Sequence, residues 1–193
     1  MIMGVKFDSE QQRFVFDFEH DGTDDIVSLT GEGYQVEAFG KCFYYGYEFG
    51  DEVDGSVRSA FIKYVKFTER LQDDPNLTQF IQKAVNNLNR RINLYDYDLV
   101  VMPQSSSRVN NYMLRYIYRF AQPTLRKMEK VMNADEELCQ TIREQNVLVI
   151  DDVTTSGSTL GEVLRTLRIL NEDNRITIFS LIGRRDLMAD VTT

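Results

Sequence analysis

Cysteine, histidine and proline are scarce in this chain of 193 residues, which has two cysteines, one histidine and three prolines. Cys42 and Cys139 lie far apart in sequence and share only His20, so the sequence argues against a structural zinc site. The composition, with 42% hydrophobic and 27% charged residues and no low-complexity tract, indicates a folded protein rather than a disordered one. No G-x-S-x-G turn is present, so nothing supports an α/β hydrolase.

Long hydrophobic runs and an excess of positive charge are also missing. No stretch approaches the roughly 20 apolar residues that cross a membrane, and the amino terminus turns polar by Asp8, which predicts no signal peptide and a cytoplasmic location. The 22 Lys and Arg stand against 30 Asp and Glu, which gives a net charge of −8. We therefore expect no membrane partner and no direct nucleic-acid partner, and an anionic substrate needs a local cationic site.

The length and the periodicity of the chain predict one compact domain with a modest appended region. Residues 13–18 and 25–29 are short, strand-like and separated by turns, which predicts a small β meander. For Tyr44, Tyr45 and Tyr47, an aromatic strand pair is favoured over a surface that stacks on a base. Residues 1–54 are therefore predicted to form a β-rich accessory region, and residues 55–193 an α/β core with a helical lead-in at 55–95.

The second half of the chain alternates predicted strands with predicted helices. Apolar runs at 97–102, 147–150 and 175–182 predict strands, and residues 109–121 and 160–170 show helical spacing. The uninterrupted β-branched run at 147–150 is typical of a parallel strand covered on both faces. This order predicts a parallel α/β sheet with right-handed crossovers, helices on both faces and ligands at the carboxyl ends of the strands.

The string Asp-Asp-Val-Thr-Thr-Ser-Gly-Ser-Thr follows the run at 147–150 directly, at 151–159. Adjacent carboxylates at the end of a core strand repel each other unless they face cations, donors or water, and Mg²⁺ and sugar diols supply such partners. A loop of small hydroxyl residues around a glycine, opening into a helix, presents N–H groups to a phosphate. Together these features predict a ribose 5-phosphate ligand. The alternative is that the acids merely end a strand and the hydroxyl residues cap a helix.

Residues 147–160 resemble the signature of the type I phosphoribosyltransferases, which bind phosphoribosyl pyrophosphate (PRPP). The resemblance implies the parallel-sheet fold of that family, with residues 1–54 as a hood-like region. It implies that Asp151 and Asp152 hold the ribose hydroxyls and Mg²⁺, the metal either directly or through hydroxyls or water. By the same resemblance the 5-phosphate is bound by Thr154, Thr155, Ser156, Gly157, Ser158 and Thr159.

A second loop follows the predicted strand at 97–102 and resembles the pyrophosphate loop of the same family. It implies that pyrophosphate is bound by Gln104, Ser105, Ser106, Ser107 and Arg108. The serines would donate hydrogen bonds to pyrophosphate oxygens, and Arg108 would neutralise their charge. In the family a mobile segment between the two loops closes over the pyrophosphate, which here falls within 119–146. For most charged side chains of that segment, a solvated helix is the simpler interpretation.

These resemblances predict a Mg²⁺-dependent, homodimeric enzyme that transfers 5-phosphoribosyl from PRPP to a nitrogen of a base-like acceptor and releases pyrophosphate. Asp151, Asp152 and Arg108 are the predicted catalytic residues. The acceptor stays open: Thr155 stands where 6-oxopurine enzymes usually place an Asp, and 119–146 lacks the histidine of orotate enzymes. The alternative function is a non-catalytic sensor of PRPP or a nucleotide that regulates a partner on the same fold.

Overall fold

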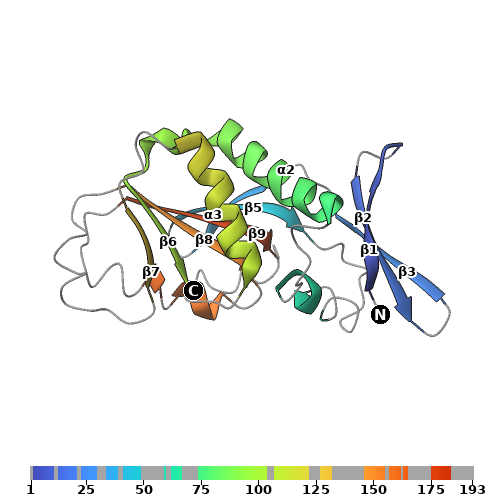
Figure 1. Ribbon diagram of the computed structural model, residues 1–193. Helices are drawn as coiled ribbons and strands as arrows, with labels where there is room; N and C mark the ends of the chain where they lie inside the picture. Colours follow the sequence, from blue (N-terminus) through green and yellow to red (C-terminus); the bar gives the residue numbers. More distant parts are fainter. Residues whose placement is uncertain are drawn as a thin grey trace.

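The structure is a computed structural model, and it describes residues 2–10, 13–20, 23–29, 34–38, 41–48, 59, 62–66, 74–103, 107–121, 127–131, 146–154, 157–161, 163–164 and 175–183. These residues form a small antiparallel sheet and a larger, mostly parallel sheet with helices packed on it (Figure 1). No helix in this part of the chain is long and apolar enough to span a membrane.

The small sheet consists of β1 (Ile2–Asp8), β2 (Arg13–His20) and β3 (Thr23–Leu29), paired antiparallel in that order. Strands β2 and β3 confirm the strands predicted at 13–18 and 25–29. The backbone register places Phe16 opposite Val5 of β1 and opposite Val27 of β3. In Figure 1 this sheet lies to one side of the larger one, beyond the end of α2.

The larger sheet contains β4 (Tyr34–Ala38), β5 (Lys41–Glu48), β6 (Leu99–Pro103), β7 (Lys127–Val131), β8 (Asn146–Val153) and β9 (Arg175–Gly183). Its strand order is β4-β5-β9-β8-β6-β7. All pairs are parallel except the β4–β5 hairpin, so the predicted parallel α/β sheet is confirmed. β4 and β5 come from the range 1–54 and pair with the larger sheet. The division of the chain at residue 54 stays a prediction.

Helices cover both faces of the larger sheet, as predicted. α2 (Pro75–Arg91) and α3 (Arg108–Ala121) lie on one face (Figure 1). The core on that face includes Leu77, Phe80, Ile81, Val100, Met113, Ile117, Leu148 and Ile150. On the other face the helical residues after β8 contribute Leu160, Val163 and Leu164, which pack on Phe43, Tyr45, Val101, Val147, Val149 and Ile178. The alternation along β8 therefore buries apolar side chains on both faces.

α2 begins at residue 75 because its amino end is capped. Asp74 Oδ1 accepts hydrogen bonds from the backbone N–H groups of Asn76 and Leu77, at 3.0 Å each. Pro75 occupies the first turn, where a missing N–H costs nothing. A short 3₁₀ turn, η1 (Leu94–Asp96), then leads into β6. Within the predicted helical lead-in at 55–95, residues 62–66 are also helical.

One expectation for the segment 119–146 is wrong. Residues 127–131 form the edge strand β7, parallel to β6, and not part of a solvated helix. Its sequence, Lys-Met-Glu-Lys-Val, does not alternate apolar and charged residues regularly, so we attribute its strand state to pairing with β6 rather than to local propensity. Charged residues are common on edge strands, where they discourage pairing with another chain. Apart from 119–121, β7 and residue 146, the segment 119–146 lies outside the described residues.

Candidate functional site

The two loops predicted from sequence start at neighbouring strand ends. β6 and β8 are adjacent and parallel, with Leu99 opposite Val147. After β6 the chain enters α3 on one face of the sheet, whereas after β8 it enters helical residues that pack on the other face. Where connections diverge in this way, a crevice opens at the carboxyl ends of the strands, and ligands of open α/β sheets bind there. The candidate site is the edge of the sheet that the carboxyl ends of β6 and β8 form.

Two buried carboxylates end strand β8. Asp151 is 6% exposed and Asp152 is 0% exposed. Each accepts a hydrogen bond from the next backbone N–H: Asp152 N donates to Asp151 Oδ1 at 2.9 Å, and Val153 N donates to Asp152 Oδ1 at 2.6 Å. Burial, and then the charge of Asp152, raise the pKa of Asp151 to about 7. Near neutral pH this carboxyl therefore exchanges between its protonated and ionised forms.

A lysine that the sequence analysis did not single out lies next to this pair. Lys66 Nζ is 3.5 Å from Asp152 Oδ1. The same ammonium group is one of the influences that lower the pKa of Asp151, against the larger effects of burial and of Asp152. No signal in the sequence pointed to Lys66, because a single lysine in the predicted helical lead-in at 55–95 cannot be told from an ordinary surface lysine.

Several buried polar atoms at this edge have no hydrogen-bond partner within the described part of the chain. They are Asp152 Oδ2, Thr154 Oγ1 and both amide atoms of Asn110. Asn110 is 1% exposed, and its amide is also among the groups that lower the pKa of Asp151, which places it close to that carboxyl. A buried polar group without a partner costs about 1–3 kcal/mol. Such groups are few in folded proteins, and their concentration at one strand end is typical of a ligand site.

The predicted phosphate loop begins at Thr154, whose backbone N–H donates to Ile182 O on β9 at 2.9 Å. The loop ends at Gly157, which has a φ of 72°, in the left-handed region that glycine adopts without strain. A helical turn then starts, with Gly161 N donating to Gly157 O at 2.8 Å. Ser158 and Thr159 are exposed on this first turn. Thr155 and Ser156 lie outside the described residues, and the binding of a phosphate here stays a prediction.

The predicted pyrophosphate loop is described only at its end. Ser107 is 1% exposed, directly before α3, and Arg108 is the exposed first residue of that helix. Gln104, Ser105 and Ser106 lie outside the described residues. The structure thus brings Ser107 and Arg108 to the strand next to the one that carries Asp151 and Asp152. Asn110, two residues further along α3, was missed because a single helical asparagine carries no signal in one sequence.

The carboxylates at this edge fit Mg²⁺ only when oxygen atoms of the substrate complete its coordination. Within the described residues, no group of three or more His, Cys, Asp and Glu side chains could hold a metal ion. Mg²⁺ ordinarily keeps several waters and binds through one or two carboxylates together with substrate phosphates. Asp151 and Asp152 supply those two carboxylates, and Asp152 Oδ2 has no partner among the residues that are described.

No family model and no curated protein matches the chain. Among solved structures, the chain is similar to the HGPRT-ase from Leishmania tarentolae in complex with GMP, at 11% sequence identity and a TM-score of 0.38. The match covers 55% of this chain and 63% of that one, so the chain spans less than two thirds of the length of that protein.

Proposed function

We propose that the protein is a Mg²⁺-dependent phosphoribosyltransferase that transfers 5-phosphoribosyl from PRPP to a nitrogen of a base-like acceptor and releases pyrophosphate. One observation carries this proposal. A buried acid pair and buried polar atoms without partners in the described structure meet at the edge of β6 and β8, where the signature string lies. Both the topology and the sequence therefore direct a polar ligand to the same place.

The polar groups at this edge suit a ribose diol. Each sugar hydroxyl donates one hydrogen bond and accepts others. Asp152 Oδ2 is a free acceptor within the described residues, and the Asn110 amide offers both a donor and an acceptor. Asp151 accepts when ionised and donates when protonated, and its pKa of about 7 gives access to both states near neutral pH. A diol can thus be held by groups that are otherwise buried without partners.

The two loops would hold the charged ends of PRPP. Thr154 to Thr159 would bind the 5-phosphate through hydroxyls and backbone N–H groups, which the left-handed Gly157 and the helical turn after it support. Gln104 to Arg108 would bind the pyrophosphate from the neighbouring strand end. The anomeric carbon would lie between the two loops, over the acid pair.

Catalysis in this arrangement needs no protein nucleophile. The bond between the anomeric carbon and the pyrophosphate oxygen breaks, and a bond between the anomeric carbon and the acceptor nitrogen forms. The proton that this nitrogen loses is taken up by a general base or by water. The transition state is expected to resemble an oxocarbenium ion, so positioning and charge stabilisation dominate. Arg108 would neutralise charge on the departing pyrophosphate, and Asp151 and Asp152 would hold the ribose. Mg²⁺, when bound with PRPP by the acid pair, supplies further neutralisation of the leaving group.

Titration calorimetry with PRPP, with and without Mg²⁺, tests the proposal, followed by pyrophosphate release against a panel of bases. We expect binding by the wild type and loss of binding in Asp152→Asn. Asp96→Asn is the matched control, because Asp96 is exposed before β6, at the opposite edge of the sheet. If Asp152→Asn bound PRPP with the same affinity as the wild type, the proposed function would be wrong. Binding without release for any base would instead assign the protein as a PRPP sensor.

A further inference from the structure

Lys66 reaches the acid pair from outside both predicted loops. Its ammonium nitrogen is 3.5 Å from Asp152 Oδ1, although the residue belongs to the helical segment 62–66, well before β6 in the chain. The chain has a net charge of −8, and the ligand expected at this edge is itself an anion. A fixed cation beside the two carboxylates would reduce the repulsion that such a ligand meets.

The segment that carries Lys66 is held in place by its neighbours. Val65 is fully buried and belongs to the same core cluster as the apolar face of α2. The Tyr64 hydroxyl donates to Asp74 Oδ2 at 3.0 Å, and the other oxygen of Asp74 caps α2. The two residues before Lys66 thus tie the segment to the amino end of α2. These contacts fix the backbone that carries Lys66, and the ion pair with Asp152 holds its ammonium group beside the acid pair.

The Lys66–Asp152 pair is unevenly buried. The Lys66 side chain is 34% exposed, whereas that of Asp152 is 1% exposed. Asp152 Oδ1 also accepts from Val153 N, so the ammonium group and that N–H share one carboxylate oxygen. An ammonium group has three N–H donors, so one contact with Asp152 leaves donors for a second partner. The partial exposure of Lys66 allows a ligand in solution to reach it.

We propose that Lys66 is a ligand-binding residue of this site, whose ammonium pairs with Asp152 and at the same time contacts a phosphate oxygen of the phosphorylated ribose. This inference rests on the proposed function. It adds to the two loops a third recognition element, delivered by residues 62–66. The phosphate oxygen belongs either to the 5-phosphate or to the pyrophosphate, and the two sources are separable with two ligands.

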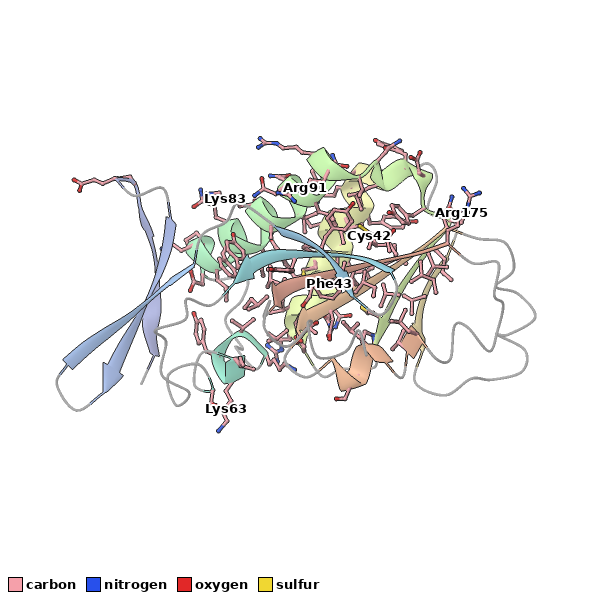
Figure 2. The ribbon with its side chains drawn as sticks, turned by 180° about the vertical axis from the view of Figure 1, so that it is seen from behind. Cys42, Phe43, Lys63, Lys83, Arg91 and Arg175 are labelled. Atoms are coloured by element: carbon pink, nitrogen blue, oxygen red, sulfur yellow. The ribbon has the colours of Figure 1, made fainter. Side chains whose placement is uncertain are left out.

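The decisive variant is Lys66→Met, which keeps the length of the side chain and removes its charge. We expect PRPP binding to weaken on the order of tenfold to a hundredfold, the loss typical of a hydrogen bond to a charged group. Lys66→Arg should retain most of the affinity. Lys63→Met is the matched control, because Lys63 lies on the same segment, is exposed, and its side chain extends outward from the helical turn (Figure 2). A weaker affinity for both PRPP and ribose 5-phosphate locates the contact at the 5-phosphate, and a loss with PRPP alone locates it at the pyrophosphate.

Removing Lys66 also leaves the Asp152 charge without its cation, so the variant could lose stability instead of a ligand contact. A second measurement therefore uses the wild type: acetylation of lysine amines by a water-soluble reagent, followed by mass spectrometry. We expect PRPP to slow modification of Lys66 and to leave Lys63 unchanged. Equal acetylation of Lys66 with and without PRPP, or unchanged or tighter binding by folded Lys66→Met, would overturn the inference while the proposed function stands. Failure of the wild type to bind PRPP at all would overturn both.

Discussion

At the scale of single residues, the candidate site combines groups that stabilise the fold poorly. Asp152 Oδ2, Thr154 Oγ1 and the Asn110 amide are buried without hydrogen-bond partners among the described residues. Each such atom lowers the stability of the free protein, because its hydration is lost and not replaced. Residues that reduce stability at a strand end are expected where a ligand later supplies the missing hydrogen bonds.

Asn110 permits a direct test of this view. We expect Asn110→Ala to weaken PRPP binding roughly tenfold, because one or two hydrogen bonds to the ligand are lost. The free energy of unfolding should fall by no more than about 1.5 kcal/mol, since the only group that the amide is seen to influence within the described structure is the Asp151 carboxyl. Calorimetry and urea unfolding measure the two effects. Asn111→Ala is the control, because Asn111 is the next residue of α3 and is exposed. A stability loss of several kcal/mol with unchanged binding would show that Asn110 has a structural role only.

At the scale of elements, the contact between α2 and the sheet depends on a glycine in β5. A Cβ atom at Gly46 would lie 2.6 Å from Ala84 Cβ and 2.9 Å from Leu181 O, which is closer than real Cβ contacts. Next to it, Tyr47 stacks on Phe80 with ring centroids 3.8 Å apart and donates its hydroxyl hydrogen to Phe80 O at 2.6 Å. The helix therefore has little room to move away from the strand.

Gly46→Ala is expected to destabilise the protein by about 1–3 kcal/mol, the usual effect of overpacking a filled core. Gly161→Ala provides the matched control, because a Cβ at Gly161 meets nothing within 4 Å and alanine favours a helix. This second substitution should leave stability unchanged or raise it by up to about 1 kcal/mol. Urea unfolding of both variants measures the contrast. Equal stability of the two would show that α2 does not pack against β5 as closely as described.

The elements that the sequence predicts well are those with a strong local pattern. β6, α3, β8 and β9 follow from apolar runs and helical spacing, and the string at 151–159 follows β8 as expected. The sequence does not predict that β5 inserts beside β9, or that residues 127–131 form an edge strand, because both depend on pairing with distant residues. Lys66 and Asn110 were missed for the same reason. Their residue types are common on helices, and only the fold brings them to Asp151 and Asp152.

At the scale of the whole molecule, the buried Asp151 couples folding stability to pH. The ordinary pKa of Asp151 is 3.8, and burial followed by the charge of Asp152 raises it to about 7 in the folded protein. As pH rises from about 4 to about 7, the unfolded chain releases this proton while the folded chain retains it. The stability linked to Asp151 is therefore present in full below a pH of about 4, is lost as the pH rises to about 7, and stays lost at higher pH.

Asp151→Asn removes this linkage and keeps an oxygen that can accept from Asp152 N, as Asp151 Oδ1 does at 2.9 Å. Without Mg²⁺ or PRPP, the variant should melt several degrees higher than the wild type at pH 8, since about 1 kcal/mol shifts Tm by roughly 2–4 °C at this size. The difference should shrink steadily towards pH 5, because the wild-type carboxyl is then protonated in the folded state. Melting curves at pH 5, 6.5 and 8 measure it, with Asp96→Asn as the control for a change of charge elsewhere. Titrating groups that do not contact Asp151 affect both proteins alike, so a difference in Tm that did not vary with pH would mean that Asp151 is ionised in the folded protein throughout this range. The nearby Lys66 would then have to offset the burial of the Asp151 charge, and Asp151 would enter ligand binding already charged.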